Sequence, residues 1–436
     1  MLTQVLQGSI LSENVPPRPA NAAVRVGGTV CGRPAELLLD EQMLSRHMLL
    51  IGGTGSGKTN AFFHFIRQLK GGMGQDDIAI VFDTKGDYLS EFFREGDCVI
   101  SAAGSGEPGV RVWNIFREIL ADGYATDKSA PNITEVSWGL FAETIERNNS
   151  NPFFPAAARD LFSALLTGLV RCTCGEPFSM RKLTNLFLRR KLDSLTAQAV
   201  GEIIGDYDDL RAVMSYIGDG MNPQGLGVLA EMQTVLRQVL DGGFAQEGDF
   251  SVREFVRARG GRTLFIEYDI ARGAALTPVY KLLIDLALKE AMSRGGRGNV
   301  YVFCDEFKLL PHLQHIEDAV NFGRSLGVKV FAGLQSIDQL YENYGEARGK
   351  NIAAGFSSVF SFRANDEDTR NFTSGLYGKN YVLEQYATMA CPMGEEEKRI
   401  GNVVEDWDIA GLAVGEAIVG LSGAKPFLFQ FDLYRG

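Results

Sequence analysis

The chain has 436 residues, of which 45% are hydrophobic and 22% charged, and this composition is typical of a globular protein with two or three domains. The formal net charge of −11 excludes a surface that attracts nucleic acid as a whole, so any polyanion would need a locally basic channel. The 6 cysteines are scattered and no secretory signal precedes them, which predicts a reduced cytoplasmic protein.

Short apolar runs rich in β-branched residues recur along the chain, and helical patterns separate them. A short hairpin is expected first, at Ala23–Val30 and Ala35–Leu39. The strands predicted after it are His47–Ile51, Ile78–Phe82, Thr263–Tyr268, Val300–Cys304, Val328–Leu334 and Ser358–Phe362, with a final strand close to the C-terminus. Near-continuous apolar strands that alternate with helices are typical of a parallel sheet covered on both faces.

The strand His47–Ile51 enters a glycine-rich segment that matches the phosphate-binding pattern G-x-x-x-x-G-K-[ST], and an amphipathic helix follows it. Backbone N–H groups of such a loop surround phosphates, and the helix N-terminus adds positive potential. We expect Lys58 to reach the β- and γ-phosphates and the Thr59 hydroxyl to ligate Mg²⁺. The predicted nucleotide-binding residues are Gly53, Thr54, Gly55, Ser56, Gly57, Lys58 and Thr59.

The strand pattern stops between about Asn114 and Gln246, where apolar residues recur at helical spacing. Two such faces run along residues 153–170 and 227–240. The spacing therefore predicts a helical insertion within an α/β domain. The predicted division is a nucleotide-binding domain of residues 1–113 and 246–436 and an all-α inserted domain of residues 114–245.

Two carboxylates follow the apolar strand Val300–Cys304 directly. We expect Asp305 to hold the Mg²⁺ shell and Glu306 to polarise the attacking water as general base. The alternative is that both carboxylates cap the next helix. The fully apolar strand and the phosphate-binding loop favour the catalytic interpretation, and an Asp-Glu pair favours an ATPase over a GTPase.

Two further residues are candidates for the same site. Gln335 follows the strand Val328–Leu334, and ligands bind at the carboxyl ends of parallel strands, so it is predicted to sense the γ-phosphate. The alternative for Gln335 is a helix-start residue. Arg324 lies at the end of the preceding helix, where it either reaches a neighbouring subunit's nucleotide as an arginine finger or complements the helix dipole. Position alone leaves these two roles open.

Three features resemble metal or membrane sites but have simpler explanations. The pair Cys172 and Cys174 has no second cysteine pair, so buried thiols are expected. His312 and His315 are one helical turn apart and are predicted to lie on the surface of a helix, without a metal. The apolar run Leu161–Val170 is shorter than the ~20 residues of a membrane span, which predicts a packed helix.

Several stretches resemble one family in particular. Ala79–Asp87, Val112–Phe116 and the segment from Asp305 through Gln335 to Gly345 are similar to motifs of the type IV coupling proteins, which are ATPases of conjugative transfer. That family belongs to a broader group with the FtsK and HerA translocases. The resemblance extends from about Val24 to Tyr434, and the helical insertion falls where the family has its all-α domain.

The resemblance implies a RecA-like P-loop NTPase fold, with a parallel-dominated twisted sheet flanked by helices. It implies ATP and Mg²⁺ as cofactors. By the same resemblance, Lys58, Thr59, Asp305 and Glu306 take the ATPase roles, Gln335 takes the sensor role and Arg324 the inter-subunit finger role. Family members typically begin with transmembrane helices, which this sequence does not show, so membrane contact is expected only through a partner or a missing N-terminal anchor.

The type IV coupling proteins resemble ring motors, in which the subunits enclose a central channel. Two segments of this chain offer local positive charge for such a channel. Five cations lie between Arg181 and Lys191, and four arginines lie between Arg253 and Arg262. In a channel, such cations would grip DNA phosphates without base recognition. The alternative is a solvated helix face and ordinary ion pairs.

The favoured hypothesis is a homo-hexameric ATPase that passes DNA, single-stranded and with a bound relaxase, to a type IV secretion channel. One alternative is a receptor whose helical insertion captures relaxase or effector proteins, with ATP as an assembly switch. Another is a duplex DNA translocase of the HerA or FtsK type. The expected location is the cytoplasm or the inner face of the bacterial cell membrane.

Overall fold

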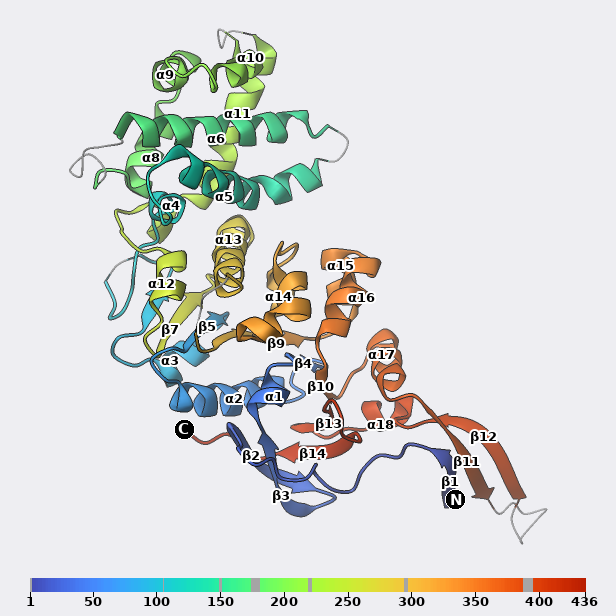
Figure 1. Ribbon diagram of the computed structural model, residues 1–436. Helices are drawn as coiled ribbons and strands as arrows, with labels where there is room; N and C mark the ends of the chain where they lie inside the picture. Colours follow the sequence, from blue (N-terminus) through green and yellow to red (C-terminus); the bar gives the residue numbers. More distant parts are fainter. Residues whose placement is uncertain are drawn as a thin grey trace.

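The computed structural model describes residues 2–104, 106–148, 151–173, 181–218, 222–293, 297–386 and 395–436. Its main sheet has 11 strands, and seven neighbouring strands are parallel to one another (Figure 1). In spatial order these seven are β10 (Ser358–Phe362), β4 (Met48–Ile51), β9 (Val328–Leu334), β8 (Val300–Cys304), β5 (Ile78–Asp83), β7 (Arg262–Glu267) and β6 (Cys98–Ile100). The prediction of a parallel sheet is confirmed, although β6 was not expected because its apolar run has only 3 residues.

An antiparallel extension continues the sheet beyond β10. Its strands, in spatial order, are β13 (Glu416–Gly420), β14 (Phe427–Phe431), β2 (Val24–Val30) and β3 (Arg33–Leu39). The predicted N-terminal hairpin corresponds to β2 and β3, and the expected final strand corresponds to β14. Strand β14, close to the C-terminus, therefore pairs with β2 of the N-terminal hairpin.

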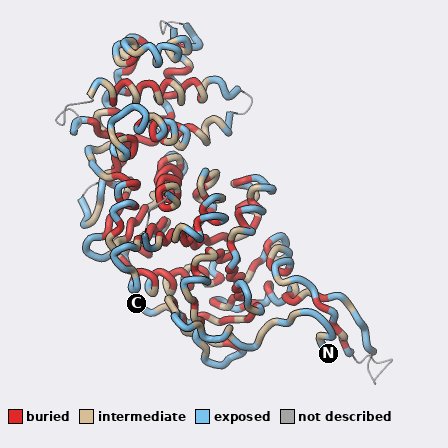
Figure 2. Tube along the Cα trace, viewed as in Figure 1, coloured by how far each residue is buried: buried red, intermediate tan, exposed pale blue. Residues whose placement is uncertain are grey.

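The central strands are buried on both faces because helices cover each of them. Leu49 and Ile51 pack into one core cluster, whereas Met48 and Leu50 pack into the other. Helices α2 (Lys58–Gly72) and α3 (Asp87–Phe92) contribute to the second cluster, and α13 (Gly273–Ala291), α14 (Ile316–Phe322), α15 (Asp338–Tyr344) and α16 (Glu346–Gly355) contribute to the first. Figure 2 shows buried residues along the central strands and α13.

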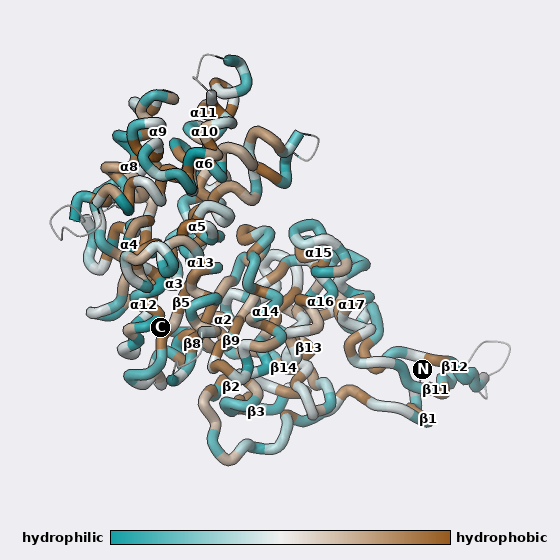
Figure 3. The backbone as a smooth tube through the Cα atoms, turned by 45° about the horizontal axis from the view of Figure 1, so that its top comes forward, coloured by the Kyte–Doolittle hydropathy of each residue, from teal (hydrophilic) through white to brown (hydrophobic). Residues whose placement is uncertain are grey.

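Six other described elements belong to this half of the molecule. They are α1 (Glu41–Leu44), α12 (Val252–Ala258), α17 (Glu367–Tyr377), α18 (Asp406–Ala410) and the 3₁₀ turns η3 (Phe307–Leu309) and η4 (Gly323–Leu326). A separate antiparallel sheet of three strands lies beside α18 in Figure 1, formed by β1 (Leu2–Gly8), β11 (Lys379–Tyr386) and β12 (Glu395–Asn402). The sequence did not predict it, because β12 is hydrophilic over much of its length (Figure 3) and β1 pairs with residues far along the chain.

The segment between β6 and β7 is helical and lies above the sheet in Figure 1. Its elements are α4 (Ile115–Ile119), α5 (Thr126–Arg147), α6 (Phe153–Thr173), α8 (Asn185–Asp193), α9 (Ala197–Ile204), η1 (Arg211–Val213), α10 (Met214–Ile217), α11 (Pro223–Val239) and η2 (Gly242–Ala245). The apolar faces predicted along residues 153–170 and 227–240 are the buried sides of α6 and α11. Among the described residues, α6 is the one helix long and apolar enough for a membrane span, but 61% of its most apolar window is buried inside the fold.

The chain enters and leaves the helical part through two adjacent segments. Trp113 lies opposite Phe250 in a parallel bridge, and Asn114 N donates to Phe250 O at 2.9 Å. Glu118 of α4 is fully buried there and accepts the Trp113 indole N–H at 2.9 Å and the Ser251 hydroxyl at 2.8 Å. Burial raises the pKa of Glu118, and its hydrogen bonds oppose that rise. These buried polar contacts fix the helical part against the sheet at the joint.

Candidate nucleotide-binding site

Neighbouring parallel strands bring the predicted residues to one edge of the sheet. In the register of the sheet, Ile51 lies opposite Leu334, and Phe82 lies opposite Cys304. The residues that continue from these carboxyl ends therefore share this edge, and they are Gly52, Asp83, Asp305 and Gln335. The edge corresponds to the place where parallel α/β sheets bind ligands.

Glycines allow the loop between β4 and α2 to turn sharply. Gly52 has φ 151°, and a Cβ at this position would lie 2.7 Å from Phe362 Cβ. Gly57 caps α2 with φ 109°, a conformation that side chains disfavour. The Gly53 N–H is held by the Arg363 carbonyl at 2.8 Å. The loop is thus packed against the end of β10 on one side.

Lys58 points back across the loop. Its Nζ donates to the carbonyls of Gly52, at 2.6 Å, and Gly53, at 3.2 Å. Burial lowers the pKa of Lys58, whereas the charges of Asp305 and Glu306 raise it. The ammonium therefore lies between the loop and the two acidic residues, which is the position from which it can reach phosphate oxygens.

Thr59 and Asp305 are in direct contact. The Thr59 hydroxyl donates to Asp305 Oδ2 at 2.8 Å, and the hydroxyl of Tyr88 donates to the same oxygen at 2.7 Å. A hydroxyl and a carboxylate at this separation are the hard oxygen ligands that Mg²⁺ prefers. The donor set thus fits a magnesium site.

Glu306 and Gln335 form the second contact at this edge. The Gln335 amide donates to Glu306 Oε1 at 3.1 Å and to Oε2 at 3.0 Å. Its Oε1 accepts the Thr54 hydroxyl at 3.1 Å. One amide therefore joins the ends of β8 and β9 to the tip of the phosphate-binding loop.

The other loop residues differ in exposure. Thr54 and Gly55 are exposed, whereas Ser56 is buried and its Oγ has no hydrogen-bond partner among the described residues. The Ser56 carbonyl accepts Gly415 N at 2.8 Å. The exposed tip is thus the part of the loop open to a ligand.

Arg324 is not brought to this cluster. It is an exposed residue of η4, which precedes β9, whereas Gln335 follows β9. A strand of 7 residues separates the two ends by about 23 Å. Arg324 therefore cannot reach the phosphate-binding loop of its own chain.

Two residues that the sequence interpretation missed contribute to the geometry. Tyr88 contacts Asp305, as described above. Asp83, buried at the end of β5, accepts the backbone N–H groups of Lys85, Gly86 and Leu89 at 3.2, 2.9 and 2.8 Å. Asp83 could have been found from the sequence, because it is an acidic residue at the carboxyl end of a predicted strand, β5, which lies next to β8.

The arginines between Arg253 and Arg262 are either buried or engaged with other groups of the chain, which contradicts their interpretation as a DNA-binding cluster. Arg253 is 2% exposed and pairs with Glu135, and Arg257 donates to Glu290 at 2.7 Å. Arg259 is buried, and Arg262 donates to its carbonyl at 3.1 Å. The alternative of ordinary ion pairs is correct here, because Arg253 and Arg257 of α12 pair with Glu135 of α5 and Glu290 of α13.

The basic segment of the helical part is more accessible. Arg181, Arg190 and Lys191 are exposed. Arg189 is half-buried and donates to the carbonyls of Arg237, at 3.0 Å, and Leu240, at 2.7 Å. Exposed cations thus remain on α8 and just before it.

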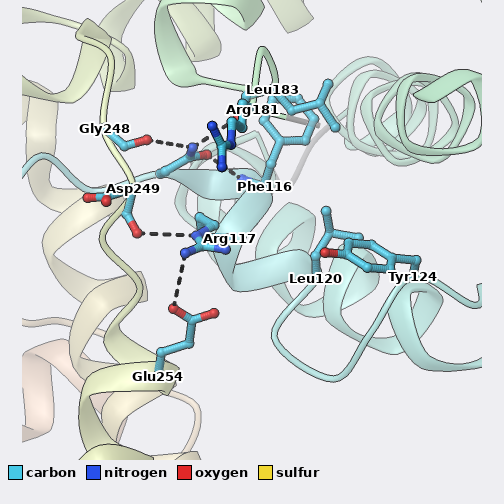
Figure 4. A pocket seen from close by; sticks show the side chains of 10 residues that line it. Phe116, Arg117, Leu120, Tyr124, Arg181, Leu183, Gly248, Asp249 and Glu254 are labelled. Carbon is cyan, nitrogen blue, oxygen red and sulfur yellow. Dashed lines mark hydrogen bonds and ion pairs between the residues drawn. The ribbon is translucent and has the colours of Figure 1, made fainter. Parts of the chain in front are cut away.

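A cavity of about 720 Å³ lies at the joint rather than at the phosphate-binding loop (Figure 4). Figure 4 shows Arg117 directed toward Asp249, whose carbonyl it donates to at 3.3 Å, and toward Glu254 at 3.9 Å. Phe116 and Leu120 form part of the apolar wall. None of the predicted phosphate-site residues lines this cavity.

The prediction that both histidines lie on a helix surface is wrong. They belong to the connection between η3 and α14, where His312 has φ 55° and His315 caps α14. His312 lies 3.3 Å from Glu146, and His315 lies 3.3 Å from Glu135, both on α5. The spacing suggested a helical turn, but contacts with α5 decide the conformation.

The cysteines show no clustering among the described residues. Cys98 and Cys304 are buried, whereas Cys172 is exposed, contrary to the buried thiol that the sequence predicted. Exposure follows from its place near the end of α6. Cys174 lies outside the described residues.

Comparison with known proteins identifies relatives of most of the chain. A family described as type IV secretion-system coupling protein DNA-binding domain matches residues 34–406. Coupling protein TraD of Escherichia coli (strain K12) is 21% identical over 422 residues, which cover 92% of this chain and 53% of TraD. The chain thus spans about half the length of this curated relative.

Two solved structures share the fold. The unbound monoclinic form of the bacterial conjugative coupling protein TrwBdeltaN70 has a TM-score of 0.72 at 20% identity, covering 99% of this chain and 95% of that one. Plasmid coupling protein TrwB in complex with ADP and Mg²⁺ has a TM-score of 0.69 at 21% identity, with the same coverage of 99% and 95%. These matches confirm the predicted RecA-like α/β fold with an all-α domain, and the resemblance on which that prediction depended.

Proposed function

Since this chain belongs to the family of type IV secretion-system coupling protein DNA-binding domains, we propose that it is an ATP-hydrolysing motor that delivers DNA to a type IV secretion channel. One observation carries the proposal. Residues from three segments of the chain meet at one sheet edge, where Thr59 is hydrogen-bonded to Asp305 and Gln335 is hydrogen-bonded to Glu306. Such a convergence is what hydrolysis of a nucleotide triphosphate requires.

The phosphate-binding loop would hold ATP. Lys58 binds the β- and γ-phosphates, and backbone N–H groups at the start of α2 face the phosphates. Thr59 and Asp305 would hold Mg²⁺, which, when bound, neutralises charge on the phosphate oxygens. TrwB, with the same fold, has been solved with ADP and Mg²⁺, which supports this assignment.

Glu306 is the proposed general base. Its carboxylate is oriented by the Gln335 amide, and it follows Asp305 directly, so it lies beside the metal ligands rather than among them. In this position it can orient a water for attack and accept its proton. Gln335 contacts both this base and Thr54 of the loop, which suits it to sense the γ-phosphate.

Arg324 is the proposed inter-subunit finger. Arg324 is too far from the phosphate-binding loop of its own chain to contact a nucleotide there, so it could act only on the nucleotide of a neighbouring subunit. An arginine finger that stabilises the transition state in trans has this arrangement. A homo-hexameric ring would place one nucleotide at each interface. The exposed cations Arg181, Arg190 and Lys191 would then contact DNA phosphates without base recognition.

The remaining assignments follow from the family. The DNA is proposed to be single-stranded and to carry a relaxase, and the chain would act in the cytoplasm or at the inner face of the bacterial membrane through a partner or an anchor. The proposed division is a nucleotide-binding domain of residues 1–113 and 246–436 and an all-α domain of residues 114–245. The paired segments at Trp113 and Phe250 support boundaries at this joint.

ATP turnover with and without single-stranded DNA tests the proposal. DNA is expected to stimulate turnover, Lys58→Ala to abolish nucleotide binding, and Glu306→Gln to abolish turnover while ATP still binds. Particle size measured in the same samples should show a ring with DNA and nucleotide. Turnover that is indifferent to every DNA tested, or unchanged in Glu306→Gln, contradicts the proposal.

A further inference from the structure

Tyr88 provides a second hydrogen bond to the carboxylate proposed for the magnesium site. Its side chain is 4% exposed, and its hydroxyl donates to Asp305 Oδ2 at 2.7 Å. The same oxygen accepts the Thr59 hydroxyl at 2.8 Å. Within the described part of the chain, no hydrogen bond to Asp305 Oδ1 is found. Two donors thus bind Asp305 Oδ2, and Asp305 Oδ1 remains available to interact with Mg²⁺ or its water ligands.

The position of Tyr88 is fixed from two directions. The buried carboxylate of Asp83 holds the start of α3 through three backbone N–H groups, which places Tyr88 in the first turn of the helix. Its ring packs against Phe62 and Phe63 of α2, with centroid distances of 6.4 and 5.0 Å. The hydroxyl therefore connects the phosphate-loop helix and the end of β5 to the end of β8.

The Tyr88 hydroxyl is the donor in its contact with Asp305. A protonated hydroxyl next to a carboxylate must donate, so the orientation of Asp305 is set by this bond.

We propose that Tyr88 is a positioning residue for Mg²⁺, which it serves by orienting Asp305; this inference rests on the proposed nucleotide-binding function. Groups that orient a metal ligand are needed for full metal affinity, although they do not touch the metal. Tyr88 thus extends the site to α3, an element outside both predicted motifs.

The variant Tyr88→Phe tests the inference, because it removes the hydroxyl and retains the ring packing. Binding of ADP is measured by calorimetry with Mg²⁺ and with EDTA. The gain in ADP affinity that Mg²⁺ provides is expected to fall about 10-fold, whereas the affinity in EDTA stays unchanged. In parallel, the Mg²⁺ concentration that half-saturates ATP turnover should rise.

Tyr280→Phe is the matched control. Tyr280 is also a buried tyrosine, and its hydroxyl accepts Asp269 N at 3.1 Å, without contact to Asp305. The control should keep the full Mg²⁺ effect even if its thermal stability falls. A second variant, Asp83→Asn, keeps the Tyr88 hydroxyl but weakens the turn that places it, and a smaller loss of the Mg²⁺ effect is expected.

The outcomes separate this inference from the proposed function. If the unaltered protein binds no ADP with Mg²⁺, the proposed function fails. If it does, and Tyr88→Phe retains the same Mg²⁺ effect, the role of Tyr88 is overturned. An equal loss of ADP affinity with Mg²⁺ and with EDTA also overturns it. That result would show that Tyr88 stabilises the phosphate-binding loop rather than the Mg²⁺ site.

Discussion

The amide of Gln335 donates to both carboxylate oxygens of Glu306, at 3.1 and 3.0 Å, while its own oxygen accepts the Thr54 hydroxyl at 3.1 Å. These contacts connect the proposed general base to the exposed tip of the phosphate-binding loop. A change in the loop can therefore alter the orientation of the base through one side chain. We therefore expect Gln335 to matter more for ATP turnover than for nucleotide affinity.

Gln335→Ala is expected to lower kcat for ATP about 10- to 100-fold with little change in KM, because an orienting contact to the base is lost while the phosphate grip remains. Steady-state kinetics at saturating Mg²⁺ measure both constants. Gln385→Ala, which changes an exposed amide of β11, is the control and should leave both constants unaltered. A raised KM with unchanged kcat would assign Gln335 to ground-state binding instead.

Mixing two inactive variants tests Arg324. Arg324→Ala and Glu306→Gln are each expected to be inactive alone, since every interface lacks one group. In mixed rings with random 1:1 assembly, about one quarter of the interfaces regain both groups, and turnover should recover to a similar fraction. No recovery in rings shown to be mixed would exclude a role in trans.

The exposed cations of α8 are expected to contribute to DNA affinity. The double variant Arg190→Ala/Lys191→Ala should weaken binding of single-stranded DNA of any sequence and reduce the slope of log affinity against log salt by about 1 to 2. Fluorescence anisotropy across a salt series measures this. Lys425→Ala, exposed in the turn before β14, is the control. An unchanged slope places the DNA elsewhere on the protein.

Glu135 is expected to make folding acid-sensitive. Burial by itself would raise its pKa, but the hydrogen bond with His315 and the charges of Arg253 and Lys289 lower it from 4.5 to about 2. Because the folded pKa is depressed, this stabilisation is complete above about pH 4.5 and disappears as the pH falls toward about 2. It amounts to at most about 3 kcal/mol.

The comparison of the native protein with Glu135→Gln isolates this contribution. The variant should be less stable at pH 7, and the difference between the two proteins should shrink as the pH falls below about 4.5. Asp285 has a buried carboxyl with a pKa raised to about 6, so its contribution favours the folded state as the pH falls. This contribution is the same in both proteins and cancels in the comparison. Urea unfolding at several pH values provides the measurement. A constant difference across pH would refute the assignment.

Contacts between distant segments account for the predictions that were wrong. The spacing of His312 and His315 is compatible with a helix, but both side chains pair with carboxylates of α5. Arg253 belongs to a run of arginines that suggests a basic surface, yet it is buried against Glu135. Local patterns carry no information about a partner more than 100 residues away.

The sequence by itself determined the phosphate-binding loop, the parallel strands and the helical insertion, because glycine spacing, apolar runs and helical periodicity are local properties. Only the tertiary structure decided that Tyr88 donates to Asp305, that Gln335 joins Glu306 to Thr54, and that Arg253 of α12 is buried against Glu135. Those contacts depend on the order of strands in the sheet and on the packing of α5 against α13, which no single segment of the sequence specifies.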